Sequence, residues 1–123
     1  MVSLINQAFE KAKSEKRPAL LTYTVAGDNT KKKSLEILKS ISNYADICEL
    51  GFPHNTPIAD GGQIQTSAYR AIKNGIKIND VFSIAKEFKK SKISIKTKKQ
   101  DIIVQIILPY HSLNLLSNVL DIT

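Results

Sequence analysis

Apolar residues follow two different patterns along the chain. In four segments they recur every three or four positions with polar residues between them, which predicts amphipathic helices. These segments are residues 2–16, 29–41, 63–73 and 80–90. Three other segments are short, nearly continuous apolar runs, at 18–28, 44–50 and 102–108. Such runs, rich in β-branched residues, predict strands that are buried on both faces, as in a parallel sheet.

Residues at the predicted helix ends have the chemistry of caps. Ser3 is placed to accept a hydrogen bond from the first amides of the first helix, and either Asn29 or Thr30 opens the second. Gly75 is placed as the C-terminal cap of the third helix, and Asn79 is placed to cap the fourth. These residues support the predicted boundaries.

The predicted order is helix, strand, helix, strand, helix, helix, strand. This alternation is typical of βαβ units, so the sequence predicts an α/β fold with a parallel sheet. Functional sites in such folds gather in the loops at the carboxyl ends of the strands. The first two predicted strands end at residues 26–28 and 49–51, which are therefore the places to search for chemistry.

Composition narrows the class of protein. A chain of 123 residues has the length of one domain, and its 42% hydrophobic and 24% charged residues are typical of a soluble globular protein. No apolar run reaches the roughly 20 residues that span a bilayer, and charges occupy the N-terminal segment where a signal peptide is apolar. Cys48 is the single cysteine, and no Cys/His cluster has metal-ligand spacing. We expect a cytoplasmic protein without a structural metal.

The net charge of +7 raises the alternative of a nucleic-acid-binding protein. However, all but two of the 18 basic residues are lysines, and only Arg17 and Arg70 have the guanidinium that reads base edges in two-point contacts. The three consecutive lysines at 31–33 lack the glycine-rich loop of a phosphate site. A solvated, lysine-rich surface is the favoured interpretation, and no nucleic-acid partner is expected.

Two carboxylates bracket the second predicted strand end. Glu49 interrupts an apolar strand, where an apolar setting would raise its pKa toward the range that is useful for proton transfer. Asp60 follows a loop stiffened by Pro53 and Pro57 and precedes two glycines, residues 61–62, that are expected to free the chain before the next helix. The pair would suit a reaction that donates one proton and removes another. From spacing alone, a solvated strand-end glutamate and a turn aspartate remain the commoner interpretation.

The other chemically capable residues are weaker candidates. His54 and His111 are isolated, and each is interpreted as a loop or surface histidine. Cys48 precedes Glu49 and therefore faces the opposite side of the strand, where a small core residue is expected.

The block around these carboxylates resembles the α subunit of tryptophan synthase. That family has a Glu-Leu-Gly, a proline-containing loop, an Ala-Asp-Gly and an Ile-Gln that opens a helix. In this chain the matching positions are residues 49–51, Pro53 and Pro57, residues 59–61, and residues 64–65. The resemblance extends from about residue 4 to about residue 95.

The resemblance implies a (β/α)₈ barrel enzyme that cleaves indole-3-glycerol phosphate to indole and glyceraldehyde 3-phosphate without a cofactor of its own. Glu49 matches the family's general acid/base, which acts at the glycerol side and at indole C3. Asp60 matches the residue that stabilises the proton on the indole nitrogen, and Tyr23 matches an aromatic position of the indole pocket. The implied partner is the pyridoxal-phosphate β subunit.

The chain departs from the family at three places. Thr56 replaces the aspartate of a Ser-Asp-Pro that helps link the loop to the β subunit, and Gly62 replaces a proline, which is expected to loosen the loop. From about Lys98 the sequence no longer resembles the family, so we expect one incomplete barrel domain, family-like over 1–97 and divergent over 98–123. The expectation is a truncated or frameshifted product with about three βα units and negligible lyase activity alone. The alternative is a non-catalytic remnant that binds the β subunit through the 52–61 loop.

Overall fold

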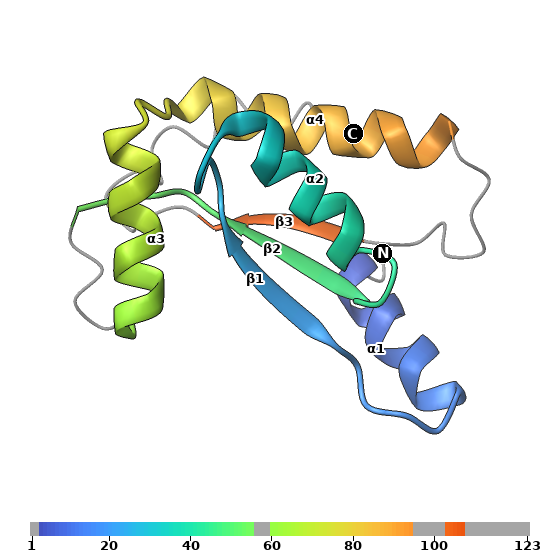
Figure 1. Cartoon of the computed structure of the whole chain (residues 1–123). Coiled ribbons are helices and arrows are strands. Elements are labelled where there is room, and N and C mark those ends of the chain that lie inside the picture. The colour runs from blue at the N-terminus through green and yellow to red at the C-terminus, as the bar shows by residue number, and fades with distance from the viewer. Residues whose placement is uncertain (1–2, 56–59, 95–102, 108–123) are drawn as a thin grey trace.

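In the computed structural model, residues 3–55, 60–94 and 103–107 are described. The elements alternate along the chain as the sequence predicted (Figure 1). They are α1 (Leu4–Ser14), β1 (Leu21–Val25), α2 (Lys31–Ile41), β2 (Ile47–Gly51), α3 (Gly62–Lys73), α4 (Ile78–Ser94) and β3 (Ile103–Ile107). None of the described helices is both long enough and apolar enough to cross a membrane.

The three strands form a parallel sheet in the order β1-β2-β3. Tyr23 of β1 pairs with Glu49 of β2, which pairs with Gln105 of β3. Residues in register share a face of a sheet, and successive residues alternate between the faces. Tyr23 and Glu49 therefore lie on one face, while Cys48 and Leu50 lie on the other. The predicted parallel α/β sheet is confirmed.

One face of the sheet is covered by α2 and α4, which lie side by side above it (Figure 1). Cys48 and Leu50 are fully buried there. They belong to one apolar cluster with Leu38 of α2 and with Ile84 and Phe88 of α4. Burial of large apolar side chains supplies most of the free energy that favours folding, so this face holds the main core.

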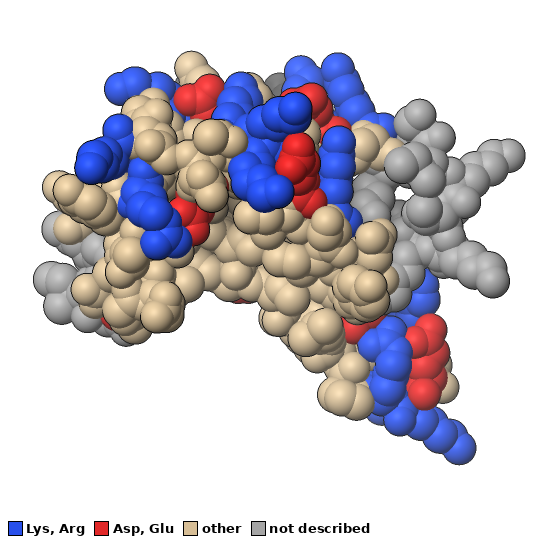
Figure 2. Space-filling view, in the orientation of Figure 1, with Lys and Arg blue, Asp and Glu red and all other residues tan. Residues whose placement is uncertain are grey.

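On the opposite face of β1, the described residues leave Leu21 and Tyr23 open, whereas Val25 at the end of the strand is covered by α3. Leu21 is 44% exposed and Tyr23 is 39% exposed. The prediction that β1 is buried on both faces is therefore wrong, because among the described helices α2 and α4 pack on one face, while α1 and α3 lie toward the two ends of the strands (Figure 1). Figure 2 shows this side of the molecule hollowed between α3 and α1, with mainly uncharged side chains along it.

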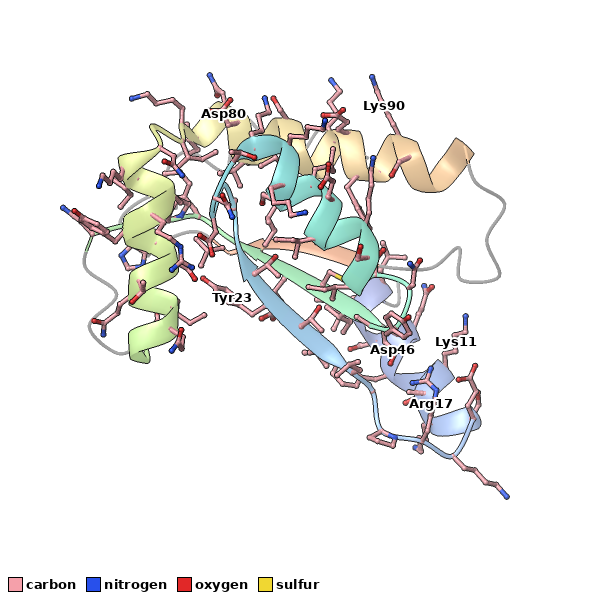
Figure 3. All side chains as sticks on the ribbon, viewed as in Figure 1. Lys11, Arg17, Tyr23, Asp46, Asp80 and Lys90 are labelled. Carbon is pink, nitrogen blue, oxygen red and sulfur yellow. The ribbon has the colours of Figure 1, made fainter. Side chains whose placement is uncertain are left out.

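A buried ion pair joins the segments that lead into β1 and β2. Arg17 donates to both carboxylate oxygens of Asp46, at 2.7 and 2.8 Å, and the Leu20 amide donates to the same carboxylate at 2.9 Å. The Asp46 side chain is only 7% exposed, so the paired guanidinium is what allows a charge to be buried there. Figure 3 shows Arg17 and Asp46 facing each other at the amino end of the sheet, where α1 also lies.

Most of the predicted helix ends are confirmed. Ser3 accepts from the Asn6 amide, Thr30 accepts from the Lys33 amide, and Gly75 follows α3 with a positive φ of 77°. Asn79, however, lies inside α4 and does not cap it. The Asp80 carboxylate accepts from the Lys77 amide at 2.9 Å instead, because an acidic side chain in the first turn can reach back to an amide that has no helical partner.

The buried stripes of two helices are narrower than the apolar pattern predicted. In α1, Ala8 and Ala12 are buried, whereas Leu4 and Phe9 are exposed. In α2, the side chain of Ile37 is 36% exposed although it belongs to the predicted apolar stripe. Helical periodicity marks the side of a helix that is apolar, but burial also requires a partner opposite that side.

Candidate active site

Two of the three predicted site residues, Tyr23 and Glu49, lie side by side on the neighbouring strands β1 and β2. Tyr23 and Glu49 are in register, so their side chains leave the open face of the sheet together. Glu49 is partly buried and Tyr23 is 39% exposed. Both are the middle residues of their strands, two positions before the carboxyl ends where sites of parallel α/β proteins form.

Gly51 makes room for Tyr23. A Cβ atom added to Gly51 would overlap the Tyr23 hydroxyl and the adjoining ring carbon. Tyr23 therefore leans along the sheet toward the carboxyl end of β2, and its hydroxyl lies directly over the Gly51 backbone. The glycine of the Glu-Leu-Gly motif is required here by the close approach of the tyrosine, since any other side chain would displace the ring.

Asp60 is brought toward this pair by α3. It precedes Gly61, the N-cap of α3, and its backbone carbonyl accepts from the Gln65 side-chain amide at 2.7 Å. Gly62 was expected in the loop but is the first residue of α3. That prediction is wrong. The first amides of a helix make no hydrogen bond within the helix, so a glycine at the first helical position is tolerated.

The charges of Asp60 and Glu49 both act on Tyr23. Burial raises the pKa of the Tyr23 phenol above its ordinary value, and the negative charges of Asp60 and then Glu49 raise it further. The phenol is therefore even less prone to ionise than an ordinary tyrosine, and its hydroxyl can donate a hydrogen bond. The structure thus brings Tyr23, Glu49 and Asp60 to one end of the sheet.

A clasp of side chains fixes α3 against the end of β1. Arg70 donates to both carboxylate oxygens of Asp28, at 2.7 and 2.8 Å, and Asn74 donates to the Asn29 carbonyl. The Arg70 guanidinium holds the pKa of the Asp28 carboxyl below its ordinary value. Beneath this clasp, Val25 packs against Ala68 and Ala71 of α3. Because Asp60 leads into α3, the clasp also limits where Asp60 can lie.

Sequence reasoning identified 27–29 as a turn but missed this clasp. Asp28 and Arg70 are 42 residues apart, so no local spacing connects them. The one available signal was Arg70 itself, which with Arg17 is one of two arginines in a lysine-rich chain, since a planar guanidinium binds a carboxylate in two-point geometry better than an ammonium does.

The remaining candidates lie where the sequence placed them. Cys48 is buried on the face opposite Glu49, and His54 is in the loop that follows β2. Residues 31–33 are exposed in the first turn of α2, where Lys31 pairs with Asp80 and Lys33 with Glu36. His111 and Thr56 lie outside the described residues. Within residues 3–55, 60–94 and 103–107, no group of three His, Cys, Asp or Glu side chains is placed to hold a metal ion.

Comparison with known proteins decides which family this arrangement belongs to. The family model described as tryptophan synthase alpha chain matches residues 9–98. The chain belongs to the tryptophan synthase alpha chain family. The resemblance found in the residues around Glu49 and Asp60 is therefore confirmed.

Individual members of the tryptophan synthase alpha chain family agree with this assignment. The tryptophan synthase alpha chain of Pelagibacter ubique (strain HTCC1062) is 84% identical over 93 residues, which are 76% of this chain and 35% of that protein. A solved tryptophan synthase a2b2 complex from Pyrococcus furiosus has 36% identity and a TM-score of 0.65, over 82% of this chain and 38% of that one. The chain thus spans about a third of the length of the curated relatives it matches.

A more distant structure supports the fold alone. Tryptophan synthase from M. tuberculosis, in its aminoacrylate-bound form, is 18% identical with a TM-score of 0.79, over 95% of this chain and 44% of that one. Structural neighbours of the tryptophan synthase alpha family are (β/α)₈ barrels, and the parallel strands with helices on their outer face match part of such a barrel. The predicted fold class, the N-terminal part of a (β/α)₈ barrel with a helix before its first strand, is confirmed.

Proposed function

We propose that this chain carries the acid/base part of an indole-3-glycerol-phosphate lyase site. Glu49 and Asp60 are the proposed catalytic residues, and Tyr23 is proposed to line the indole pocket. The observation that carries the proposal is the register of Tyr23 with Glu49, together with the effect of the Asp60 and Glu49 charges on the pKa of Tyr23. Membership of the tryptophan synthase alpha chain family supports it.

The reaction needs a proton delivered to one atom and a proton removed from another. Protonation of indole C3 makes the ring cationic, and the Asp60 carboxylate would stabilise the positive charge that then develops at the ring N–H. Removal of the proton from the hydroxyl next to C3 forms a carbonyl, and the bond between C3 and the glycerol carbon breaks. The bonding pair returns to the ring, which leaves indole and glyceraldehyde 3-phosphate. Glu49 is the proposed general acid/base for the proton transfers at indole C3 and at the glycerol side, and the proposed reaction needs no cofactor.

The matched segment covers only about a third of the length of the curated relatives. We propose a single incomplete barrel domain, family-like over 1–97, that acts in the cytoplasm. Phosphate sites of (β/α)₈ barrels form after the late strands, and binding energy from such remote groups positions the reacting atoms. With about a third of the length of its relatives, the chain alone is expected to release negligible indole.

A tryptophan synthase β subunit is the proposed protein partner. The relative from Pyrococcus furiosus was solved as an a2b2 complex, which supports the assignment. The loop 52–61 is the proposed contact, and its described part leaves the carboxyl end of β2 beside the site. If the chain binds a β subunit but never contributes to indole release, the alternative of a non-catalytic binding remnant is supported instead.

The decisive experiment transplants the matched segment into a complete enzyme. Residues 9–98 of this chain replace the equivalent segment of the Pelagibacter ubique alpha chain, and indole release from indole-3-glycerol phosphate is measured with and without β subunit. The chimera is expected to be active, and Glu49→Gln or Asp60→Asn to reduce kcat by about 100-fold or more, the usual contribution of a general acid or base. Glu36→Gln, an exposed glutamate on α2, is the matched control. A Glu49→Gln chimera as active as its parent would refute the proposal.

A further inference from the structure

Helix α3 is held against the sheet mainly through small side chains in its second half. Ala68 and Ala71 are buried and pack against Val25 of β1, with Ile64 partly buried beside them. At the start of the helix, a Cβ atom added at either glycine, residues 61–62, would meet no described atom within 4 Å. Alanines form low ridges on a helix, so they allow close approach to β1 but fix the tilt of α3 only weakly.

The turn that follows β1 is a fixed base for α3. The Gly27 amide donates to the hydroxyl of Ser34 at 3.1 Å, and Ser34 is buried in α2. On its other side the turn lies against Ile76, which follows α3. A Cβ atom added to Gly27 would come within 2.5 Å of the Ile76 side chain. The turn is thus tied to the body of the fold through α2 and lies close to the end of α3.

The contacts between this turn and α3 are directional. Arg70 of α3 donates to both carboxylate oxygens of Asp28, at 2.7 and 2.8 Å, and also to the Ser67 hydroxyl at 3.2 Å. One helical turn later, Asn74 donates to the Asn29 carbonyl. Two parallel hydrogen bonds between planar groups fix orientation as well as distance. The orientation of α3 therefore depends on this clasp more than on its alanines.

Asp60 lies at the far end of the helix that the clasp holds. Its carbonyl accepts from the Gln65 side-chain amide at 2.7 Å, so its backbone moves with the first turns of α3. The helix rises about 12 Å between Gly62 and Arg70. Over that length a tilt of about 10° at the clasp displaces the start of the helix by about 2 Å, which is enough to break a hydrogen bond.

We propose that Arg70 and Asp28 are positioning residues of the candidate site, whose two-point ion pair sets where the Asp60 carboxylate lies relative to Tyr23 and Glu49. The pair is partly exposed, with side-chain accessibilities of 49% for Arg70 and 26% for Asp28, so its contribution to stability is small. What the pair adds is the orientation of α3. The proposal rests on the proposed function for the role of Asp60 in the reaction, whereas the placement of Asp60 is measured without substrate.

The first test measures the titration of Tyr23, which responds to the charge of Asp60. Arg70→Gln is expected to lower the pKa of the phenol, because α3 tilts and the Asp60 carboxylate moves away. Loss of a positive charge alone would raise this pKa, so the sign of the shift separates displacement from simple electrostatics. Ultraviolet absorbance of the full 123-residue chain follows the phenolate, and Tyr23→Phe identifies the transition that belongs to Tyr23.

A double-mutant cycle connects the shift to Asp60. Asp60→Asn should lower the pKa of the phenol in the parent and should change it less in the Arg70→Gln background, because the carboxylate is then already displaced. Lys73→Gln removes an exposed cation from the same helix and is the matched control, which should not lower the pKa. If circular dichroism shows that Arg70→Gln is unfolded, Arg70→Lys replaces it, since lysine keeps the charge but loses the two-point geometry.

The second test measures indole release by the chimera that carries residues 9–98 in the Pelagibacter ubique alpha chain. Arg70→Gln is expected to lower kcat by about 10-fold to 100-fold with a smaller change in KM, because a misplacement of about 1 Å can cost that much, and Lys73→Gln is expected to keep the parental kcat. A Tyr23 pKa that is unchanged or raised in Arg70→Gln would overturn the proposal. So would a parental kcat in Arg70→Gln when Asp60→Asn is inactive. Full activity of the Asp60→Asn chimera would instead refute the proposed function, and the titration would still decide whether Arg70 positions Asp60.

Discussion

The two faces of the same small sheet have different roles. On the face under α2 and α4, Leu50 is fully buried, and Phe88 of α4 is 1% exposed. On the other face, Leu21 and Tyr23 remain accessible and lie beside Glu49. The strands alternate between these faces residue by residue, so one apolar run contributes to both. The apolar sequence of a strand therefore does not reveal which of its two faces is covered by another element.

The covered face stabilises the fold, whereas the open face carries the candidate chemistry. Asp60 approaches the open face from α3, and the clasp between Asp28 and Arg70 holds α3 at its border. The candidate polar groups are thus kept out of the main core. Substitutions on the two faces should consequently have different effects, in stability on one side and in assembly and chemistry on the other.

The largest expected difference is in stability. Phe88→Ala should lower the free energy of unfolding by about 3–5 kcal/mol, because it leaves a cavity in the main core. Leu21→Ala on the open face should lower it by only about 1 kcal/mol, because nearly half of the leucine stays in contact with water in the folded state. Urea unfolding followed by circular dichroism measures both. Equal losses would show that the open face is covered in solution.

A smaller, pH-dependent effect is expected at the border of the open face. Asp28→Asn should lower the free energy of unfolding by about 1 kcal/mol at neutral pH, a value limited by the partial exposure of both partners. The hydrogen bond from Arg70 lowers the folded-state pKa of Asp28 below its ordinary value of 3.8. The stabilisation is therefore present above pH 3.8 and is lost as the pH falls through the lowered pKa.

Urea unfolding at a series of pH values checks this expectation. The parent and Asp28→Asn should differ at neutral pH and converge in acid, while Glu36→Gln serves as a control for the loss of an exposed carboxylate. A difference that persists unchanged in strong acid would mean that the ion pair is not its cause.

The smallest effect is a change in the titration of Tyr23. Burial is the main cause of its raised pKa, followed by the charge of Asp60 and then that of Glu49. Asp60→Asn should therefore lower the pKa of the phenol more than Glu49→Gln does, and in both variants it should stay above the ordinary tyrosine value. Ultraviolet absorbance of the phenolate measures the titration, and Tyr23→Phe identifies the transition that belongs to this residue. Titrations unaffected by either variant would place the carboxylates away from Tyr23.

Local chemistry made much of the fold predictable. Helices and strands follow periodicities of 3.6 and 2 residues that are fixed by backbone geometry. Ser3 and Thr30 accept from amides three residues later, and the Gly75 amide donates to the Ile72 carbonyl at the end of α3. The order of elements and the parallel sheet could therefore be predicted. The role of Asn79 could not, because Asn79 and Asp80 compete for the same helix start and only the folded backbone decides which side chain reaches a free amide.

The sequence by itself determined the element order, the family-like block and the two carboxylates, because each depends on residues that are close together in the chain. The tertiary structure alone decided that Tyr23 leans over Gly51, that Arg70 holds Asp28 across 42 residues, and that one face of β1 stays open. These features are contacts between distant segments, and nothing in local periodicity specifies which segments meet. Whether an apolar side chain is buried is likewise decided by the element that packs against it.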